Sequence, residues 1–289
     1  MSIAANRKLR IMNHVSKFDP GQQRKRYDAR YTERMVPNTK KWQTSWAEHI
    51  TRYTFAATHL QGCRVLDLGC GIGYGTRYLA EHGASEVVGV DYSQEAITQA
   101  QSEFHHPRAS FVQDDAQQLD QIYGPFDGIV AYEIFEHVDS PTSMLARCRD
   151  LLSVGGWFYC STPNTRFRPK LKDGITPRNP FHVKEYLEEE FREMLCKYFD
   201  SVEIFGQDYT PAYKRQVQAL SRLQSCDFAL WSNPLVRLGR LIQRLKGVRV
   251  NWMEDSCVYP PLEEDIVICE GTRGIEDATT FIARCRKQS

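Results

Sequence analysis

The chain is 289 residues long, is 42% apolar and 25% charged, and carries a formal net charge of +1. These values are typical of a soluble globular protein and exclude a strong overall field of either sign. The nine cysteines contain no Cys-x-x-Cys pair, so neither a zinc knuckle nor a disulfide framework is indicated. Reduced thiols, no apolar leader and no apolar run long enough to cross a bilayer predict a cytoplasmic protein.

Charge is unevenly distributed, because residues 1–41 hold eleven Lys and Arg against three Asp and Glu. We therefore predict a basic N-terminal arm over 1–44, which is either solvated or in contact with an anionic partner. The remainder, 45–289, is predicted to be one α/β domain.

Short apolar segments alternate with helical patterns through the first part of this domain. Strands are expected over residues 64–68, 86–90, 110–113, 126–131 and 157–161. Helices are expected over residues 45–60, 74–81, 93–102 and from 140 to about 155, with Ser93 as an N-cap and Pro141 as a first helical residue. Strands and helices at this spacing predict βαβ crossovers and a parallel sheet.

The regular pattern changes after residue 163. A basic, proline-containing loop over 164–182 precedes a helix over 184–198 and a strand over 202–205. Residues 208–262 are predicted to be an insertion with two helices. The tail over 280–286 alternates like a final strand, and a helix from about residue 275 is the competing interpretation.

A glycine-rich turn follows the first expected strand, in Asp67-Leu-Gly-Cys-Gly-Ile-Gly-Tyr-Gly75. Glycines allow a tight turn and a close approach of a ligand at the carboxyl end of a strand. The dinucleotide fingerprint G-x-G-x-x-G is absent, because Tyr74 occupies its third glycine position when counted from Gly69. The charge of Asp67 suits an ammonium group better than a phosphate. Asp91, 22 residues after Gly69, can accept both hydroxyls of a ribose.

Four segments, in order and evenly spaced, resemble the motifs of class I S-adenosylmethionine-dependent methyltransferases. Residues 65–73 resemble motif I, 88–91 the acidic end of the second strand, 114–116 the adenine-contacting segment and 126–130 the fourth strand. The resemblance implies S-adenosylmethionine as cofactor. It also implies a Rossmann-like, doubly wound, mostly parallel seven-stranded sheet with a helical insertion.

The resemblance further implies a role for each residue of these motifs. Backbone N–H groups of Gly69 and Gly71 would meet the methionine part of the cofactor, and Asp67 would orient its amino group directly or through water. Asp91 would hold the ribose. The adenine would face Asp115, with Ala116 beside it.

A second polar cluster follows the fourth strand, in Tyr132-Glu-Ile-Phe-Glu-His-Val138. On a helix, Glu133, Glu136 and His137 would share one face at the carboxyl end of the sheet. Two carboxylates and an imidazole can bind a divalent cation such as Mg²⁺. The segment resembles the Glu-x-x-Glu-His of ubiquinone-biosynthesis O-methyltransferases and the metal site of small-RNA 3′-end methyltransferases, which adds a distant histidine. His182 is the candidate for that histidine.

A metal-free interpretation of the same residues stays open. In it, His137 or His182 is the general base that takes a proton from a hydroxyl acceptor, since an unperturbed histidine titrates in the right range. No Asn/Asp-Pro-Pro-Tyr segment follows the fourth strand, which favours an oxygen acceptor over an amide or adenine nitrogen.

Three further segments carry clues to the acceptor. A resemblance to bacterial methyltransferases found beside glycosyltransferases is carried by residues 34–37, the pairs Glu48-His49 and Arg52-Tyr53, and residues 179–186. This resemblance implies a sugar hydroxyl as the acceptor. The stretches 164–184 and 213–250 are basic and are either solvated surface or contacts for an anionic acceptor.

Residues 235–246 form an amphipathic pattern, with leucines on one face and arginines on the other. Such a helix either caps its own domain or lies on the inner face of an anionic membrane. The oligomeric state is not indicated by any pattern.

Functions of other classes are less consistent with these motifs. A nicotinamide-dependent oxidoreductase predicts the missing G-x-G-x-x-G turn. A non-catalytic RNA-binding module predicts decayed cofactor motifs and aromatic-plus-glycine signatures, and neither is found. The leading interpretation is a methyltransferase acting on a hydroxyl of a glycan or other small molecule, with nucleic acid an unfavoured partner. Quinone or phenol O-methylation and metal-dependent RNA methylation are the alternatives.

Overall fold

The computed structural model describes residues 40–168, 174, 179, 181–218, 261–270 and 275–288. Those up to Asp208, with those from Ile268 onward, form one compact unit, and those between Tyr209 and Val267 belong to a second. The N-terminal arm before residue 40, the amphipathic pattern over 235–246 and most of the basic stretch 213–250 lie outside the described residues. Among the described helices, none is both long enough and apolar enough to cross a membrane.

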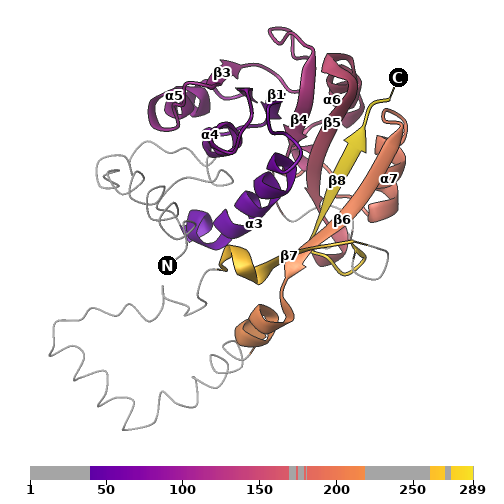
Figure 1. Cartoon of the computed structure of the whole chain (residues 1–289). Coiled ribbons are helices and arrows are strands. Elements are labelled where there is room, and N and C mark those ends of the chain that lie inside the picture. The colour runs from indigo at the N-terminus through magenta and orange to yellow at the C-terminus, as the bar shows by residue number, and fades with distance from the viewer. Residues whose placement is uncertain are drawn as a thin grey trace, which may run out of the picture. The chain divides into compact units, whose positions relative to one another are not determined.

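A parallel sheet forms the centre of the first unit (Figure 1). Its strands are β1 (Arg64–Leu68), β2 (Glu86–Asp91), β3 (Ala109–Gln113), β4 (Phe126–Ala131) and β5 (Leu152–Pro163). They lie in the order β3-β2-β1-β4-β5. Because the chain moves outward from β1 to β3 and then returns to the other side of β1, β1 and β4 meet at a topological switch point.

The sheet continues beyond β5 with three further strands. The last described strand, β8 (Thr280–Arg286), runs antiparallel between β5 and β6 (Ser201–Tyr209). A short strand, β7 (Ile266–Cys269), adds to the edge beside β6. The sheet therefore has eight strands where the motifs predicted seven, because β7, which follows the expected insertion 208–262, was not predicted as a strand.

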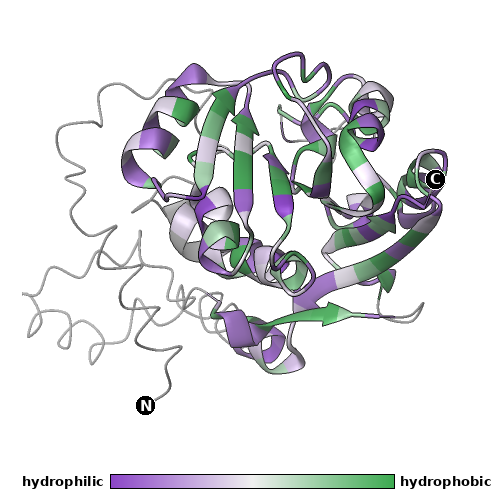
Figure 2. Cartoon of the chain, turned by 45° about the horizontal axis from the view of Figure 1, so that its top comes forward, coloured by the Kyte–Doolittle hydropathy of each residue, from purple (hydrophilic) through white to green (hydrophobic). Residues whose placement is uncertain are grey.

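Among the described residues of the first unit, five α-helices accompany the sheet: α3 (Lys40–Ala57), α4 (Tyr74–Glu81), α5 (Gln94–Glu103), α6 (Pro141–Leu151) and α7 (Glu188–Leu195). Neighbouring residues on a strand point to opposite faces, so Val65 packs with α3 and α4 whereas Leu66 packs with α6 and α7. Both faces are covered, which explains why the strands of the parallel sheet are mostly apolar (Figure 2).

The bounds of β1, α4, β4 and β8 agree with the sequence prediction, and Ser93 caps α5 by accepting a hydrogen bond from the amide of Ala96 at 3.4 Å. The predicted end of α6 near Gly155 is wrong. The helix ends at Leu151, and Leu152 already pairs with Phe126 in the sheet. Gly155, with a φ of +78°, belongs to an irregularity within β5 rather than to a helix end.

Several other predicted bounds also differ from the structure. The helix expected from residue 45 begins at Lys40, and the one expected over 184–198 is confined to Glu188–Leu195. In the second unit, residues 211–218 are helical, and the amide of Thr210 donates to the carbonyl of Asp265 at 2.8 Å.

Asn164, directly after β5, connects three segments of the first unit through hydrogen bonds of its side chain. Its side chain is fully buried, and Nδ2 donates to the carbonyls of Glu276 at 3.2 Å and Ala278 at 2.8 Å. Its Oδ1 accepts from the amide of Arg166 at 3.0 Å. One amide group thus fixes the approach to β8 and the turn that follows β5.

We expect Asn164→Ala to lower the free energy of unfolding by about 2–3 kcal/mol, because the buried carbonyl of Ala278 and the partly buried carbonyl of Glu276 lose their donor. Chemical denaturation would measure the change. The exposed amide Gln118 is a matched control, and Gln118→Ala should change stability by less than about 0.5 kcal/mol. Equal effects of the two substitutions would contradict this role of Asn164.

Candidate functional site

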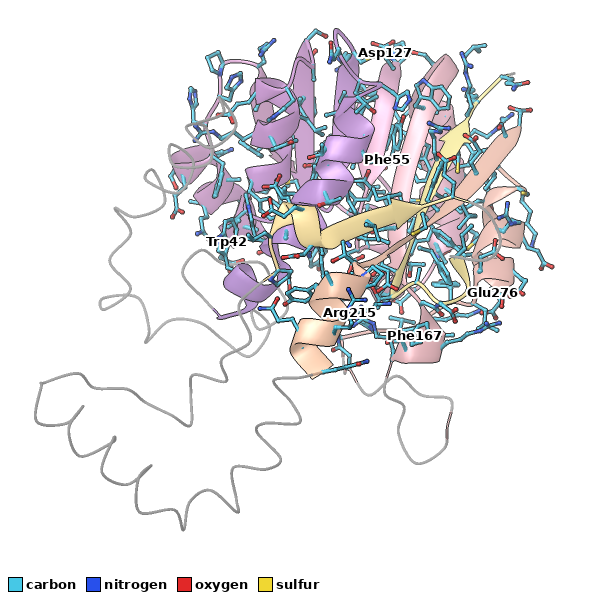
Figure 3. The ribbon with its side chains drawn as sticks, turned by 60° about the horizontal axis from the view of Figure 1, so that its bottom comes forward. Trp42, Phe55, Asp127, Phe167, Arg215 and Glu276 are labelled. Carbon is cyan, nitrogen blue, oxygen red and sulfur yellow. The ribbon has the colours of Figure 1, made fainter. Side chains whose placement is uncertain are left out.

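A cavity of about 730 Å³ lies at the switch point, at the carboxyl ends of β1 and β4. Nine of the ten predicted site residues line it: Gly69, Gly71, Asp91, Asp115, Ala116, Glu133, Glu136, His137 and His182. Asp67 is the tenth and does not line it. The turn after β5, which carries Phe167, is at this end of the sheet, whereas Asp127 marks the opposite end (Figure 3).

The glycine turn between β1 and α4 forms the floor of the cavity. Gly69, Gly71 and Gly73 all have positive φ angles, which only glycine adopts without strain. A Cβ on Gly73 would lie 2.7 Å from the ring of Phe111, whereas a Cβ on Gly71 would meet nothing within 4 Å. The turn therefore packs against the protein on one side and leaves room for a ligand on the other.

The amides of this turn are already engaged by the protein. The N–H of Gly69 donates to the carbonyl of Val90 at 2.8 Å, and the N–H of Gly71 donates to Asp91 Oδ2 at 2.9 Å. Asp91 Oδ1 accepts from the amide of Ser93 at 2.9 Å. Asp91 thus joins the end of β2 to the glycine turn, and its carboxylate is held at the cavity wall. The glycines contribute an open backbone surface here rather than free donors.

Asp67 lies beneath the glycine turn and is completely buried. Its two oxygens accept hydrogen bonds from Tyr53 Oη at 3.0 Å and from Thr76 Oγ1 at 2.6 Å. Burial raises the pKa of Asp67 to about 6, although both hydrogen bonds act in the opposite direction. In this position Asp67 fixes Tyr53, which does line the cavity, instead of forming the surface itself.

The segment after β3 is organised by two carboxylates. Asp114 accepts from the amides of Asp115 and Gln121, each at 2.8 Å. Asp115 in turn accepts from the amide of Gln117 at 2.9 Å. These bonds to the backbone give the loop one defined shape at the edge of the cavity.

The helix expected over 132–138 is not formed. Only Phe135–His137 makes a single 3₁₀ turn, and Glu133 has a φ of +52°, which is uncommon for any residue but glycine. Ser161 on β5 stabilises this conformation, because its Oγ accepts from the amide of Glu133 at 3.1 Å and donates to Glu133 Oε1 at 2.9 Å. Glu133 therefore points toward β5 and does not share a helical face with Glu136.

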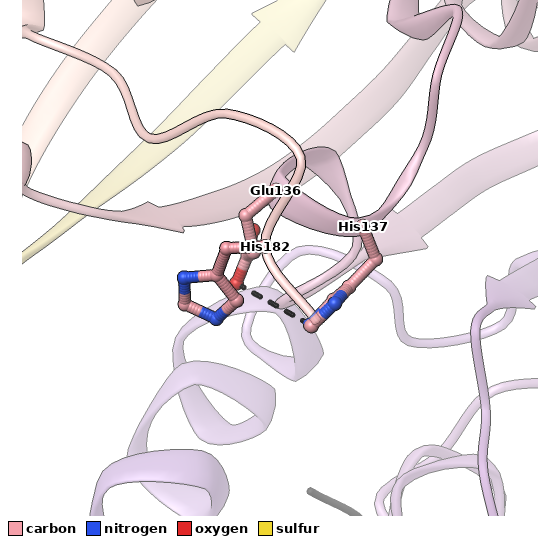
Figure 4. A group of neighbouring side chains, drawn as sticks. All are labelled: Glu136, His137 and His182. Atoms are coloured by element: carbon pink, nitrogen blue, oxygen red, sulfur yellow. Dashed lines mark ion pairs between the residues drawn. The ribbon is translucent and has the colours of Figure 1, made fainter. Parts of the chain in front are cut away.

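Glu136, His137 and His182 are brought together (Figure 4). One potential ligand atom from each lies within 4.8 Å of the others, and Glu136 Oε1 is 4.0 Å from His137 Nε2. The loop that carries His182 is docked on the 3₁₀ turn, since the amide of Val183 donates to the carbonyl of Glu136 at 2.6 Å. Two segments more than forty residues apart thus form one cluster.

Both imidazoles of the cluster are oriented by an acceptor at Nδ1. His137 Nδ1 lies 3.0 Å from the carbonyl oxygen of Phe181, and His182 Nδ1 lies 2.8 Å from Glu185 Oε1. Because a carbonyl and a carboxylate can only accept, each Nδ1 must carry the proton. In the neutral rings Nε2 is then the nitrogen with a lone pair, which suits either a base or a metal ligand.

Arg52 is the most important site residue without a predicted role. Its side chain is buried, NH1 donates to Gln207 Oε1 at 2.6 Å, and NH2 lies 3.8 Å from Glu133 Oε1. Within the described residues its Nε and NH2 form no hydrogen bond. The sequence offered only the likeness of Arg52-Tyr53 to other methyltransferases, because the partners of Arg52 come from distant strands.

The pKa values of the two glutamates of this site are shifted in opposite directions. Burial raises the pKa of Glu133, but the charges of Arg52, His49 and Arg168 outweigh burial, so this pKa is lowered overall. For Glu136, burial and the charge of Glu133 raise the pKa well above its ordinary value. Two neighbouring carboxyl groups of the site therefore differ strongly in acidity.

Aromatic rings complete the wall formed by α3 and the glycine turn. Tyr53 meets Tyr74 and Tyr132 edge to face, with ring centroids 6.0 and 5.2 Å apart. The Tyr74 hydroxyl lies 2.7 Å from His49 Nδ1, and the Tyr132 hydroxyl donates to the carbonyl of Arg52 at 2.9 Å. The hydroxyls are thus used within the protein, which leaves ring surface to line the cavity.

Comparisons with known proteins agree with this geometry. Residues 65–156 match the family model of a methyltransferase domain. The chain is 29% identical over 163 residues to a Mycolicibacterium smegmatis protein named "Probable S-adenosylmethionine-dependent methyltransferase", an alignment covering 56% of this chain and 62% of that one. It is 30% identical over 171 residues to a ubiquinone biosynthesis O-methyltransferase of Aromatoleum aromaticum, covering 53% of this chain and 70% of that one.

The chain spans about 60% of the length of the first curated relatives that it matches. A solved structure of an S-adenosylmethionine-dependent methyltransferase from Archaeoglobus fulgidus superposes with a TM-score of 0.51 at 19% identity, over 83% of this chain and 94% of that one. That likeness shows the fold, and the sequence matches show the family. The chain belongs to the class I S-adenosylmethionine-dependent methyltransferases.

Proposed function

We propose that this protein transfers the methyl group of S-adenosylmethionine to a hydroxyl group of a small molecule, in the first instance a sugar or glycan. One observation carries the proposal: Glu136, His137 and His182 each offer a potential ligand atom within 4.8 Å of the others, and all three line the cavity that the glycine turn and Asp91 also line. The O-methyltransferase name of the Aromatoleum aromaticum relative supports an oxygen acceptor.

The residues present fit the cofactor that the family implies. The open side of Gly71 offers backbone surface, and Asp91 offers a carboxylate suited to ribose hydroxyls. When bound, S-adenosylmethionine supplies an electrophilic methyl group on a sulfonium, so the protein has chiefly to align the nucleophile.

His182 is the stronger candidate for the base. Its Nε2 would take the hydroxyl proton of the acceptor while the oxygen–methyl bond forms and the methyl–sulfur bond breaks. The carboxylate of Glu185 at Nδ1 would stabilise the imidazolium that results, whereas the acceptor at Nδ1 of His137 is the uncharged carbonyl of Phe181. Glu185 is itself buried, which strengthens its interaction with the ring.

The metal-assisted version remains the second candidate, and the spacing of Glu136, His137 and His182 favours it. One carboxylate and two imidazoles are a common ligand set for a divalent transition metal. A cation there would lower the pKa of the acceptor hydroxyl and replace the base. Glu133 fits this set less well than the other three, because Arg52 is already its partner. Mass gain of one methyl group across a panel of hydroxylated acceptors would test the proposed activity directly.

For the cofactor, we expect Asp91→Ala to weaken binding of S-adenosylmethionine at least about tenfold, since two charge-assisted hydrogen bonds to the ribose are lost. Isothermal titration calorimetry would measure the affinity, and circular dichroism would confirm that the variant is folded. Asp120→Ala, which changes an exposed carboxylate of the same unit, should bind as the wild type does. Unchanged affinity in a folded Asp91→Ala protein would contradict the role given to Asp91.

For the acceptor cluster, we expect turnover to survive EDTA and to fall about 10²–10⁴-fold in His182→Asn. Glu185→Gln should lower kcat with little change in cofactor affinity, because Glu185 acts only through His182. Loss of activity in EDTA with recovery on adding Mg²⁺ or Mn²⁺ would establish the metal version instead. Full turnover by a protein lacking both His137 and His182 would show that the cluster is structural.

A further inference from the structure

Arg168 has a fixed place at the mouth of the cavity. It belongs to the turn after β5, where Asn164 accepts from the amide of Arg166 at 3.0 Å. The amide of Arg168 donates to the carbonyl of Thr165 at 3.3 Å, and the amide of Thr165 donates to the carbonyl of Tyr186 at 3.1 Å. The turn that leads to Arg168 is therefore held by backbone hydrogen bonds, and the exposed side chain of Arg168 lines the cavity.

Among the described arginines and lysines of this region, Arg168 is distinguished by a guanidinium without an ion-pair partner. The others pair as Arg52–Glu133 at 3.8 Å, Arg166–Glu276 at 3.4 Å and Lys184–Glu190 at 3.1 Å. Glu276 and the turn at Phe167 are both marked in Figure 3. In the part of the chain that the structure describes, the side chain of Arg168 forms neither an ion pair nor a hydrogen bond.

The charge of Arg168 acts on the acceptor end of the cavity. It contributes to the field that lowers the pKa of Glu133, where burial opposes the decrease and Arg52 and His49 add to it. Glu133 forms its ion pair with buried Arg52 and not with Arg168. Within the described residues, the guanidinium of Arg168 is thus a positive charge without an ion-pair partner, close to the groups that would surround the reacting hydroxyl.

Other charged residues limit where an anion could bind. Glu48 on α3 and Asp139 after the 3₁₀ turn also line the cavity, as does Asp91 at its cofactor end. Carboxylates at these places repel an anionic ligand. Arg168 is the lining residue whose fixed positive charge suits an anion.

We propose that Arg168 is the receptor for an anionic group, a phosphate or a carboxylate, carried by the acceptor. The inference rests on the proposed function, since it assumes that the acceptor occupies this cavity beside the cofactor. A guanidinium binds either group with two parallel N–H donors, which gives orientation as well as affinity. The acceptor class is then an acidic or phosphorylated hydroxyl compound rather than a neutral one.

The test uses the full chain saturated with S-adenosylhomocysteine and three probes: glucose, glucose 1-phosphate and glucuronate. Calorimetry should show at least about tenfold tighter binding of one or both anionic sugars than of glucose. Arg168→Gln should abolish this preference, and Arg168→Lys should retain part of it. Arg166→Gln is the matched control, because Arg166 is two residues away but is paired with Glu276 and does not line the cavity.

Each outcome decides the question. Tighter binding of glucose 1-phosphate alone or of glucuronate alone identifies which anion the protein binds. Loss of this preference in Arg168→Gln but not in Arg166→Gln supports the proposal. Equal behaviour of all three probes, or a preference that persists in Arg168→Gln or disappears equally in Arg166→Gln, overturns it. Wild-type protein that fails to bind S-adenosylhomocysteine would instead overturn the proposed function, which the same titration reports separately.

Discussion

The ion pair between buried Arg52 and half-buried Glu133 is the constraint on which the proposed acceptor side of the cavity depends. Arg52 comes from α3, Glu133 from the turn after β4, and the third partner, Gln207, from β6. Removing either charge would leave the other uncompensated in the interior, which is far more costly than the pair itself is favourable. The wall of the cavity and the polar turn at its base are therefore coupled, and α3 cannot move away without exposing a charge.

The same ion pair makes the pKa values of two glutamates, Glu133 and Glu136, differ. Burial raises the pKa of Glu133, but the charge of Arg52 helps to lower it overall, whereas burial and the charge of Glu133 raise the pKa of Glu136. Neighbouring carboxyl groups whose pKa values are driven apart are a common way to obtain an acid and a base from one residue type. Here the difference originates in a residue eighty positions upstream of the carboxylates that it governs.

Local patterns were sufficient for the cofactor half of the fold and insufficient for the acceptor half. β1 and the glycine turn could be predicted because buried strands and glycines with positive φ are encoded in a few adjacent residues. The conformation of Glu133 could not, because Ser161 on another strand imposes it. Glu136, His137 and His182 lie close together, as the resemblance implied, but Glu133 of the same predicted group is paired with Arg52 and the expected helix is absent. The pairing of Arg52 depends on three separate elements, so no single segment indicates it.

The position of β8 has a consequence for how the protein reaches its final form. This strand is the last described element in sequence, yet it lies inside the sheet, between β5 and β6. During synthesis, β5 and β6 would both present open edges until residues 280–286 emerge, and open edges invite pairing with other chains. The loop that brings His182 to the cavity lies between these two strands in sequence. Completion of the acceptor site is thus tied to the arrival of a strand about a hundred residues later in the chain.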